Sequence, residues 1–211
     1  MLKAAAALAA MVMALTLGAC GDDDDGGKTP SATFNKFDVT AEGEYYVNKD
    51  GAISNDEEDG YVFRVHIFPA SGLTPYECRL DKYTGSESSV SIPEGVTYIW
   101  TDAFEKCESL TSVVIPRSVD AIRDKAFYEC EALTTVTIPD RMEKILINAF
   151  YICQGLATVK YTGTKEQWKS IESEYGAIDD QISDDTSRVT VECKDGKIKW
   201  SESERSWVDA D

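Results

Sequence analysis

The sequence has little positive charge and only one histidine. Its 211 residues include 38 Asp and Glu against 21 Lys and Arg, which gives a formal net charge of −17. A surface this acidic repels nucleic acid and anionic lipid. The single imidazole, His66, lies in the alternating segment VFRVHIF, where we expect a structural role, and no exposed thiol is expected beside it. These absences argue against nucleic-acid binding and against a cysteine-histidine enzyme.

Motifs of common catalytic and cofactor sites are also absent. No phosphate loop, dinucleotide fingerprint or metal-ligand spacing occurs, and no carboxylate spacing singles out a glycosidase pair. The segment NKDGAISNDE resembles part of a calcium loop but has Tyr46 in the first place, where the loop needs Asp. Its later places are filled by Asn48, Asp50, Gly51, Ile53 and Glu57. An Asp-Gly turn is the better interpretation, and we predict no enzyme, no metal and no cofactor.

No apolar run is long enough to span a membrane as a stable helix. The longest, AAAALAAMVMALTL, has about fourteen residues and follows a short basic start, which is the pattern of a signal peptide. It ends in Leu-Gly-Ala-Cys at residues 17–20, which resembles the lipobox of bacterial lipoproteins. We predict a signal peptide at residues 1–19 and lipidation of Cys20. An ordinary secretory signal is the alternative.

An acidic segment follows Cys20. The run GDDDDGG cannot bury apolar surface and repels itself, so residues 20–33 are expected to form the lipidated end and an extended tether. An acidic run in this place resembles the surface-export signal of some Gram-negative lipoproteins. The expected location is the bacterial cell envelope, with the protein anchored in the outer membrane and exposed at the surface.

The middle of the chain repeats itself with a period of 23 residues. Three copies, at residues 92–114, 115–137 and 138–160, share eight identical columns: Ile, Pro, Ile, Ala, Phe, Cys, Leu and Val. A fixed period in this range with an L-x-x-V-x-I core is typical of leucine-rich-repeat solenoids. One coil cannot bury its apolar residues alone, so each column is expected to become a ladder through a stacked core.

Side-chain alternation predicts which repeat residues face inward. Val113 and Ile115 are expected to point into the core, with Ser112 and Val114 outside. The repeated cysteines lie along the solenoid axis, where they cannot form a tetrahedral zinc site, so we expect buried, inert thiols; they are Cys107, Cys130 and Cys153. Cys78 and Cys193 lie outside this column, and the sequence leaves open whether they form a disulfide.

Coils of the form C-x-x-L-x-x-V-x-I-P-x-x-V-x-x-I-x-x-x-A-F resemble the BspA-like, treponemal-type leucine-rich repeats of bacterial surface lipoproteins. The resemblance runs from about Tyr83 to Ile171. It implies an exported binding protein, because members of that family are commonly exported and several are associated with adhesion to host matrix or to other cells.

One column departs from that family. Where Gly usually follows the inward Ile, this chain has Trp100, Arg123 and Leu146, which we call the stripe. Stacked coils would align the stripe on the surface as a candidate partner site, since Trp and Arg are enriched in binding hot spots. The alternative is that the three stripe residues bind no partner and only cover the edge of the coils as isolated surface residues. The second candidate surface is the outward face of the repeat strands, with Ser112, Val114, Thr135, Thr137, Thr158 and Lys160.

The predicted fold is an α/β-type solenoid, a short leucine-rich-repeat stack of about three to four coils at residues 83–162. A solenoid exposes an apolar coil at each end and needs caps. Residues 34–82 are expected to form a β-rich N-terminal cap. Residues 163–211 are expected to form a C-terminal cap of one helix and a hairpin that turns at Asp195-Gly196. That helix should begin at the capping box Thr164 to Gln167, bury Trp168, Ile171 and Tyr175, and end at Gly176.

These features predict a lipid-anchored, non-enzymatic surface module that binds a protein or glycan of the host or the envelope, with adhesion as its role. A structural subunit of an envelope complex is the alternative, and a hydrolase is a more remote one. About four strands at about 4.8 Å spacing give a repeat sheet only some 15–20 Å long, which is short for a standard interface of about 800 Å² per partner. We therefore expect the repeat sheet alone to bind weakly.

Overall fold

The computed structural model describes residues 43–48, 53–54, 61–68, 77–146, 148–171, 189–201 and 203–210. The predicted signal peptide, Cys20 and the acidic tether lie outside these residues. Within the described ranges, no helix is long and apolar enough to cross a membrane.

Each coil contributes one strand to a parallel ladder that runs along the solenoid. The strands are β5 (Ser89–Ser91), β7 (Ser112–Val114), β9 (Thr135–Ile138) and β11 (Thr158–Tyr161). Val90, Val113, Val136 and Val159 pair in register across them, so every coil repeats the position of the one before it. Val113 and Ile115 are buried and Val114 is 44% exposed, which confirms the predicted inward and outward positions.

A second, shorter strand lies on the other side of each coil. These strands are β6 (Tyr98–Ile99), β8 (Ala121–Ile122) and β10 (Lys144–Ile145), again in parallel register. The described coils are therefore β-strand and turn throughout, and the expected α/β type is wrong in that respect. The solenoid of about four coils is as predicted.

Backbone hydrogen bonds explain why the turns of the coils are not helices. In a helix, each N–H donates within its own segment. Here Phe104 N donates to Ala126 O at 2.7 Å and Phe127 N to Ala149 O at 2.8 Å, so these bonds join one coil to the next. Two columns per coil also have left-handed φ values near +55° to +60°, which interrupt any helical turn; they are Asp102, Lys125 and Asn148, and Lys106, Glu129 and Ile152.

A ladder of aromatic rings fills the core. Tyr83, Phe104, Phe127 and Phe150 stack with ring centroids 5.1, 4.7 and 5.0 Å apart, and all four are buried. The Ala column beside them leaves room for the rings because its side chains are single methyl groups. Phe104 and Phe127 each contact a ring on both sides and Phe150 contacts Phe127, so each coil depends on a neighbour to bury its aromatic residue.

The cysteine column lies beside this ladder. The thiols of Cys130 and Cys153 are fully buried and donate to the carbonyl oxygens of Phe104 and Phe127, each at 3.0 Å. Cys107, in the first of the three copies, is half-buried. A hydrogen bond with the Cys130 thiol, together with burial, raises the pKa of Cys107. Buried and protonated thiols are poor nucleophiles, as predicted for this column.

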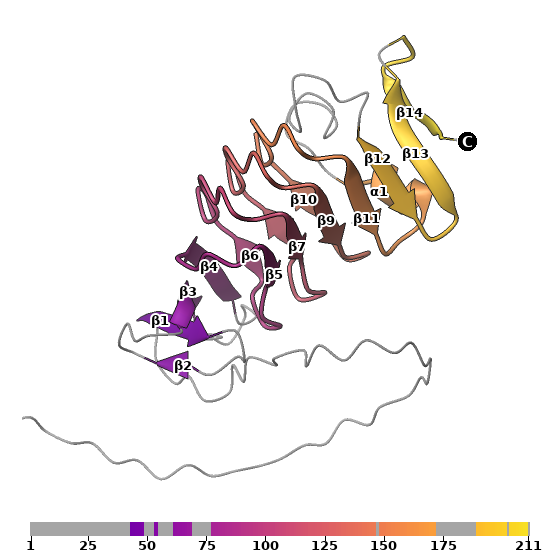
Figure 1. The fold of residues 1–211 in the computed structure, drawn as a ribbon. Helices are drawn as coiled ribbons and strands as arrows, with labels where there is room; N and C mark the ends of the chain where they lie inside the picture. Colours follow the sequence, from indigo (N-terminus) through magenta and orange to yellow (C-terminus); the bar gives the residue numbers. More distant parts are fainter. Residues whose placement is uncertain are drawn as a thin grey trace, which may run out of the picture.

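Cys78 and Cys193 do not form a disulfide. Both are free thiols. Cys78 is buried on β4 (Glu77–Tyr83), whereas Cys193 ends β12 (Thr190–Cys193), and these strands belong to different sheets. The two flanks lie at opposite ends of the solenoid (Figure 1), beyond the reach of an S–S bond.

The N-terminal flank extends the sheet of short strands. β1 (Gly43–Asn48), β2 (Ile53–Ser54) and β3 (Tyr61–Phe68) are antiparallel, β4 pairs with β3, and β4 runs parallel to β6. We call this seven-stranded sheet, in the order β10-β8-β6-β4-β3-β1-β2, the N sheet. The candidate calcium loop overlaps β1, which ends at Asn48, and contains β2, and these two strands pair as a hairpin. Strands therefore occupy part of this segment, and residues 49–52 and 55–60 lie outside the described part.

The C-terminal flank extends the other sheet. β12 runs parallel to β11, and β13 (Gly196–Ser201) and β14 (Ser206–Asp209) follow as antiparallel strands. We call this sheet, β14-β13-β12-β11-β9-β7-β5, the C sheet. The helix α1 (Lys165–Lys169) lies between β11 and β12 in the chain. Thr164 and Gln167 form the two reciprocal hydrogen bonds of a capping box at its start, and Trp168 is buried. The helix ends at Lys169 with Ser170 as its C-cap, so its predicted continuation as far as Gly176 is wrong. Ile171 lies after the helix and is half-buried, and Tyr175 and Gly176 lie outside the described residues.

Candidate ligand-binding surface

The stripe residues lie in one column on the outside of the N sheet. The backbone N–H groups of Trp100, Arg123 and Leu146 donate to Leu80, Ile99 and Ile122 of the preceding strand, each at 2.9 Å. These bonds repeat the same geometry from coil to coil, so the three side chains follow each other along the solenoid. All three are half-buried.

Trp100 lies between two arginines. The guanidinium carbon of Arg79 is 4.6 Å from the centre of the Trp100 ring, and that of Arg123 is 4.9 Å from it. These arginines come from β4 and from the end of β8, which flank β6 on its two sides, so they cover opposite faces of the indole. Arg79 also lies 5.5 Å from the Phe68 ring. These distances are within the range of cation–π attraction, and we call Phe68, Arg79, Trp100 and Arg123 the Arg–Trp row.

An ion pair orients the first arginine of the row. Arg79 Nε donates to Asp81 Oδ1 at 2.5 Å and Arg79 Nη2 to Asp81 Oδ2 at 3.2 Å. A two-point bond of this kind fixes the plane of the guanidinium group. Arg123 differs, because its Nε is buried and makes no hydrogen bond within the described part of the chain.

A pocket of about 320 Å³ opens beside Arg123. Two carboxylates, Asp120 and Glu143, face two cations, Arg123 and Lys144, in its wall. Burial, together with the neighbouring Glu143, raises the pKa of Asp120. The pocket is near the lower end of the size range of small-ligand sites; its walls are Tyr98, Asp120, Ala121, Arg123, Glu143, Lys144 and Leu146.

The second predicted surface, the outward face of the C sheet, has short side chains. Ser112, Thr135 and Thr158 form one cross-strand row, and Val114, Thr137 and Lys160 form the next. Ser112 Oγ lies 2.8 Å from Ser89 Oγ. The repeats supply four strands, β5, β7, β9 and β11, as predicted. Pairing with the C-terminal flank extends the sheet to seven strands, or about 29 Å at about 4.8 Å spacing.

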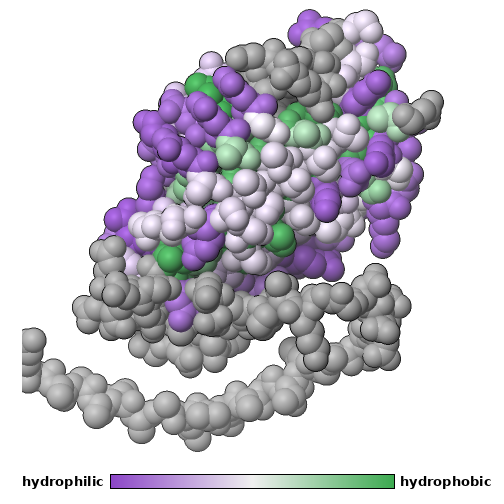
Figure 2. All heavy atoms as spheres, viewed as in Figure 1, coloured by the Kyte–Doolittle hydropathy of each residue, from purple (hydrophilic) through white to green (hydrophobic). Residues whose placement is uncertain are grey.

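The face seen in Figure 2 has no large apolar patch. That face has a pale centre, strongly hydrophilic residues along its edges and only scattered apolar residues. Large continuous apolar patches are the usual mark of a hydrophobic docking site. On this face, polar contacts are therefore the chemistry that the surface offers.

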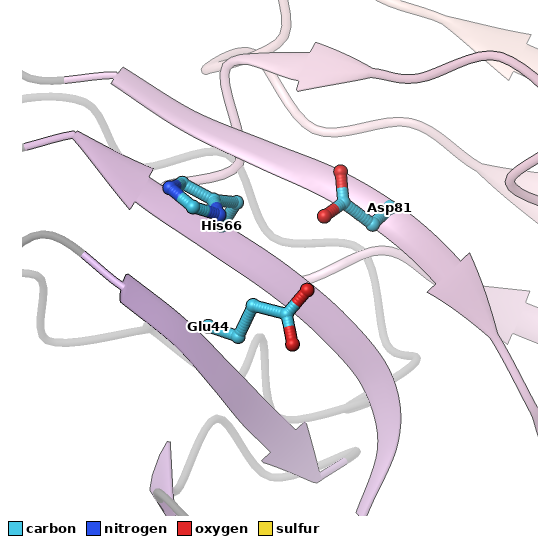
Figure 3. Close-up of side chains that lie close together, drawn as sticks. All are labelled: Glu44, His66 and Asp81. Atoms are coloured by element: carbon cyan, nitrogen blue, oxygen red, sulfur yellow. The ribbon is translucent and has the colours of Figure 1, made fainter.

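A cluster that sequence spacing did not reveal lies on the N sheet next to the Arg–Trp row. Glu44, His66 and Asp81 come from β1, β3 and β4, on the same side of these strands (Figure 3). One ligand atom of each lies within 4.8 Å of the other two. His66, expected to be structural, is half-buried and its ring packs 4.4 Å from that of Phe68. The only sequence signal for the cluster is that each residue lies in a strand-like segment.

The sequence comparisons identify the repeats. A family model described as "BspA type Leucine rich repeat region" matches residues 82–175 in six copies. No curated protein in the comparison matches the sequence.

Solved structures with similar folds come from several bacteria. A leucine-rich repeat protein of Treponema pallidum is 24% identical with a TM-score of 0.45, over 56% of this chain and 64% of its own. One from Bacteroides capillosus is 21% identical with a TM-score of 0.49, over 63% and 94%. A leucine-rich cell surface protein of Faecalibacterium prausnitzii is 24% identical with a TM-score of 0.29, over 56% and 42%.

The family assignment rests on the repeats themselves. The eight shared columns become eight ladders in the stacked coils, and the family model covers the same region. Residues 82–175, a little under half of the chain, match the model of the BspA-type leucine-rich repeat region, so this part of the chain is a repeat region of that type.

Proposed function

We propose that the protein is a non-enzymatic surface module that binds a protein partner through the outer face of the N sheet. The observation that carries this proposal is the Arg–Trp row beside the pocket at Arg123. Trp, Tyr and Arg contribute most of the affinity in typical interfaces. Here they are already stacked, so little side-chain freedom is lost on binding.

The covered faces of Trp100 favour a protein over a glycan. Sugar rings stack on open aromatic faces, whereas both faces of this indole contact guanidinium groups. Arg123 keeps a buried N–H without a hydrogen bond among the described residues. Because this N–H is buried, a carboxylate or backbone carbonyl of a partner can bond to it only when the Arg123 side chain shifts outward on binding.

The C sheet is proposed as a weaker, accessory surface. Its outward residues are mostly Ser and Thr, which are under-represented among residues that dominate affinity. Many copies anchored on one membrane would add such contacts by avidity.

Anchoring and location complete the proposal. We infer that Cys20 is lipidated and that the acidic tether holds the solenoid at the outside of the outer membrane, where it serves adhesion. The two flanks are proposed to act as caps, because each extends one sheet at one end of the stack. If the protein is instead a subunit of an envelope complex facing inward, external protease will not cleave it on intact cells.

The test is binding of the soluble monomer and of the same protein arrayed on beads to purified host-matrix proteins and to the cell's own envelope proteins. We expect weak binding by the monomer and strong binding by the array. A Trp100→Ala/Arg123→Ala variant should lose both.

Two controls make the result specific. Arg117→Ala removes an arginine of the same coil that only forms an exposed ion pair with Asp140, and it should bind like the wild type. Thr135→Arg blocks the C sheet. Tight monomer binding that survives the double substitution but is lost with Thr135→Arg would move the site to the C sheet.

A further inference from the structure

Glu44, His66 and Asp81 offer a ligand set with a definite chemical preference. Imidazole is typical of sites for Zn²⁺ and neighbouring transition ions, while carboxylates complete such sites and Ca²⁺ or Mg²⁺ sites are usually built from oxygen alone. The three ligand atoms lie within 4.8 Å of one another. Ligands of a tetrahedral Zn²⁺ site at about 2.0–2.1 Å from the ion are about 3.3 Å apart. Binding of an ion therefore requires side-chain rotations that draw the three ligand atoms together, and Glu44, the exposed member, is the freest to rotate.

The sheet register brings the three residues together. Glu44 pairs directly with His66 across β1 and β3. The register between β3 and β4 shifts at Arg64/Val65, where Leu80 pairs with Val65 and Lys82 with Arg64. Asp81 is therefore the extra residue of a β-bulge. Asp81 lies on the outer face by ordinary alternation with Arg79, since Leu80 between them is buried. The bulge shifts the alternation only from Lys82 onward.

A second layer of contacts holds the central carboxylate. Asp81 accepts both bonds from Arg79, and its side chain is only 9% exposed. Each carboxylate oxygen has a second lone pair, so Asp81 can bind an ion while Arg79 orients it. Hydrogen bonds of this kind to a ligating carboxylate are a regular feature of metal sites.

The net charge of the chain favours cations. Arg79, Arg64 and Lys82 lie on the same two strands as His66 and Asp81, so the negative field comes from the chain as a whole, whose formal charge is −17. A negative field raises the local concentration of cations. The exposed side of the cluster, at Glu44, leaves a path for the ion and room for water as a fourth ligand.

We propose that Glu44, His66 and Asp81 form a site for one divalent transition-metal ion of the Zn²⁺ type. The ion would link β1, β3 and β4 of the N-terminal flank. It would share Asp81 with Arg79, and so it would adjoin the Arg–Trp row. The proposal does not rest on the proposed function, since the site needs neither Trp100 nor Arg123, although Arg79, a member of the Arg–Trp row, also contacts the site.

The experiment titrates the purified full chain with Zn²⁺ by calorimetry and with Co²⁺ by visible absorption. We expect one ion per chain, with Co²⁺ bands that lack the intense charge-transfer absorption of a thiolate ligand. Glu44→Gln and His66→Phe should each weaken binding at least tenfold, because loss of even an outer contact costs a metal site about 10–100-fold. Phe at position 66 keeps a ring against Phe68.

Glu108→Gln is the matched control, since Glu108 is an exposed carboxylate in a turn of the repeats. It should bind Zn²⁺ like the wild type. The absence of stoichiometric binding, or binding that is unchanged in Glu44→Gln and His66→Phe, would overturn the proposal. Binding that disappears only with Cys193→Ala would place the ion on a thiol and overturn it as well. Circular dichroism of each variant confirms that the fold is retained.

Discussion

At the scale of single residues, the cysteine thiols illustrate how position decides reactivity. Cys130 is buried and still has a hydrogen-bond partner, because its thiol donates to the Phe104 carbonyl. That carbonyl also accepts from Cys107 N at 3.3 Å. The column is therefore held by weak bonds between coils as well as by packing, and only its first member reaches solvent.

We predict that the thiols react with iodoacetamide in the order of their exposure. Cys193 and Cys107 should react slowly in the native protein, and Cys78, Cys130 and Cys153 only after unfolding. Burial, with the charge of Asp195, raises the pKa of Cys193 to about 11. Because the thiolate is the reactive form, the rate at Cys193 should keep rising with pH above about 8.5, the ordinary thiol pKa. A rate that levels off near that pH in folded protein would contradict the raised pKa.

A second residue-scale prediction concerns Ile152, whose φ is +60°. A β-branched side chain is strained in the left-handed region, whereas Asn tolerates it. Ile152→Asn should therefore raise the free energy of unfolding by about 0.5–1 kcal/mol, measured by urea denaturation. Glu129→Asn, in the same column, should gain less because Glu is not β-branched. If Ile152→Asn destabilises the protein, the lost apolar contact of this half-buried side chain outweighs the strain.

At the scale of elements, the coils are stable only in contact with each other. The short strands β6, β8 and β10 have two residues each, too few to form a sheet alone. The rings of Phe104, Phe127 and Phe150 connect the coils through the core. The sequence predicted these inward columns because the period is local. It did not predict the second strand, since its residues also suited a helical connection.

Phe127, in the middle of the ring ladder, provides the test at this scale. Phe127→Ala should lower the free energy of unfolding by about 3–5 kcal/mol, because the cavity opens between two stacked rings. Tyr128→Ala removes the adjacent half-buried ring, which stacks on Tyr151 at 6.0 Å, and should cost about 1 kcal/mol. If thermal or urea unfolding shows that the two variants lose the same free energy of unfolding, the buried ring ladder contributes no more to stability than the ring pair at the surface.

At the scale of the whole molecule, the two flanks extend different sheets. The N-terminal strands continue the sheet of the stripe, and the C-terminal strands continue the sheet of the Ser and Thr rows. The first of these joins Phe68 and Arg79 to Trp100 and Arg123. The candidate surface therefore belongs to the repeats and the N-terminal flank together.

The prediction at this scale concerns attachment. Cys20→Ala should abolish incorporation of labelled lipid and release the protein or leave its precursor uncleaved, since an anchored chain needs its acylated thiol. Cys193→Ala is the matched control and should be labelled normally. Unchanged lipid incorporation in Cys20→Ala would end the lipoprotein hypothesis.

The sequence by itself determined the repeated part of the fold. Its period assigned Val113 to the core and aligned Trp100, Arg123 and Leu146, because in a solenoid each position repeats its neighbour. Only the tertiary structure joined Glu44, His66 and Asp81, and placed Arg79 on Trp100. The flank has no repeat, so the register of its antiparallel strands and the bulge at Asp81 arise from pairing between segments distant in the sequence.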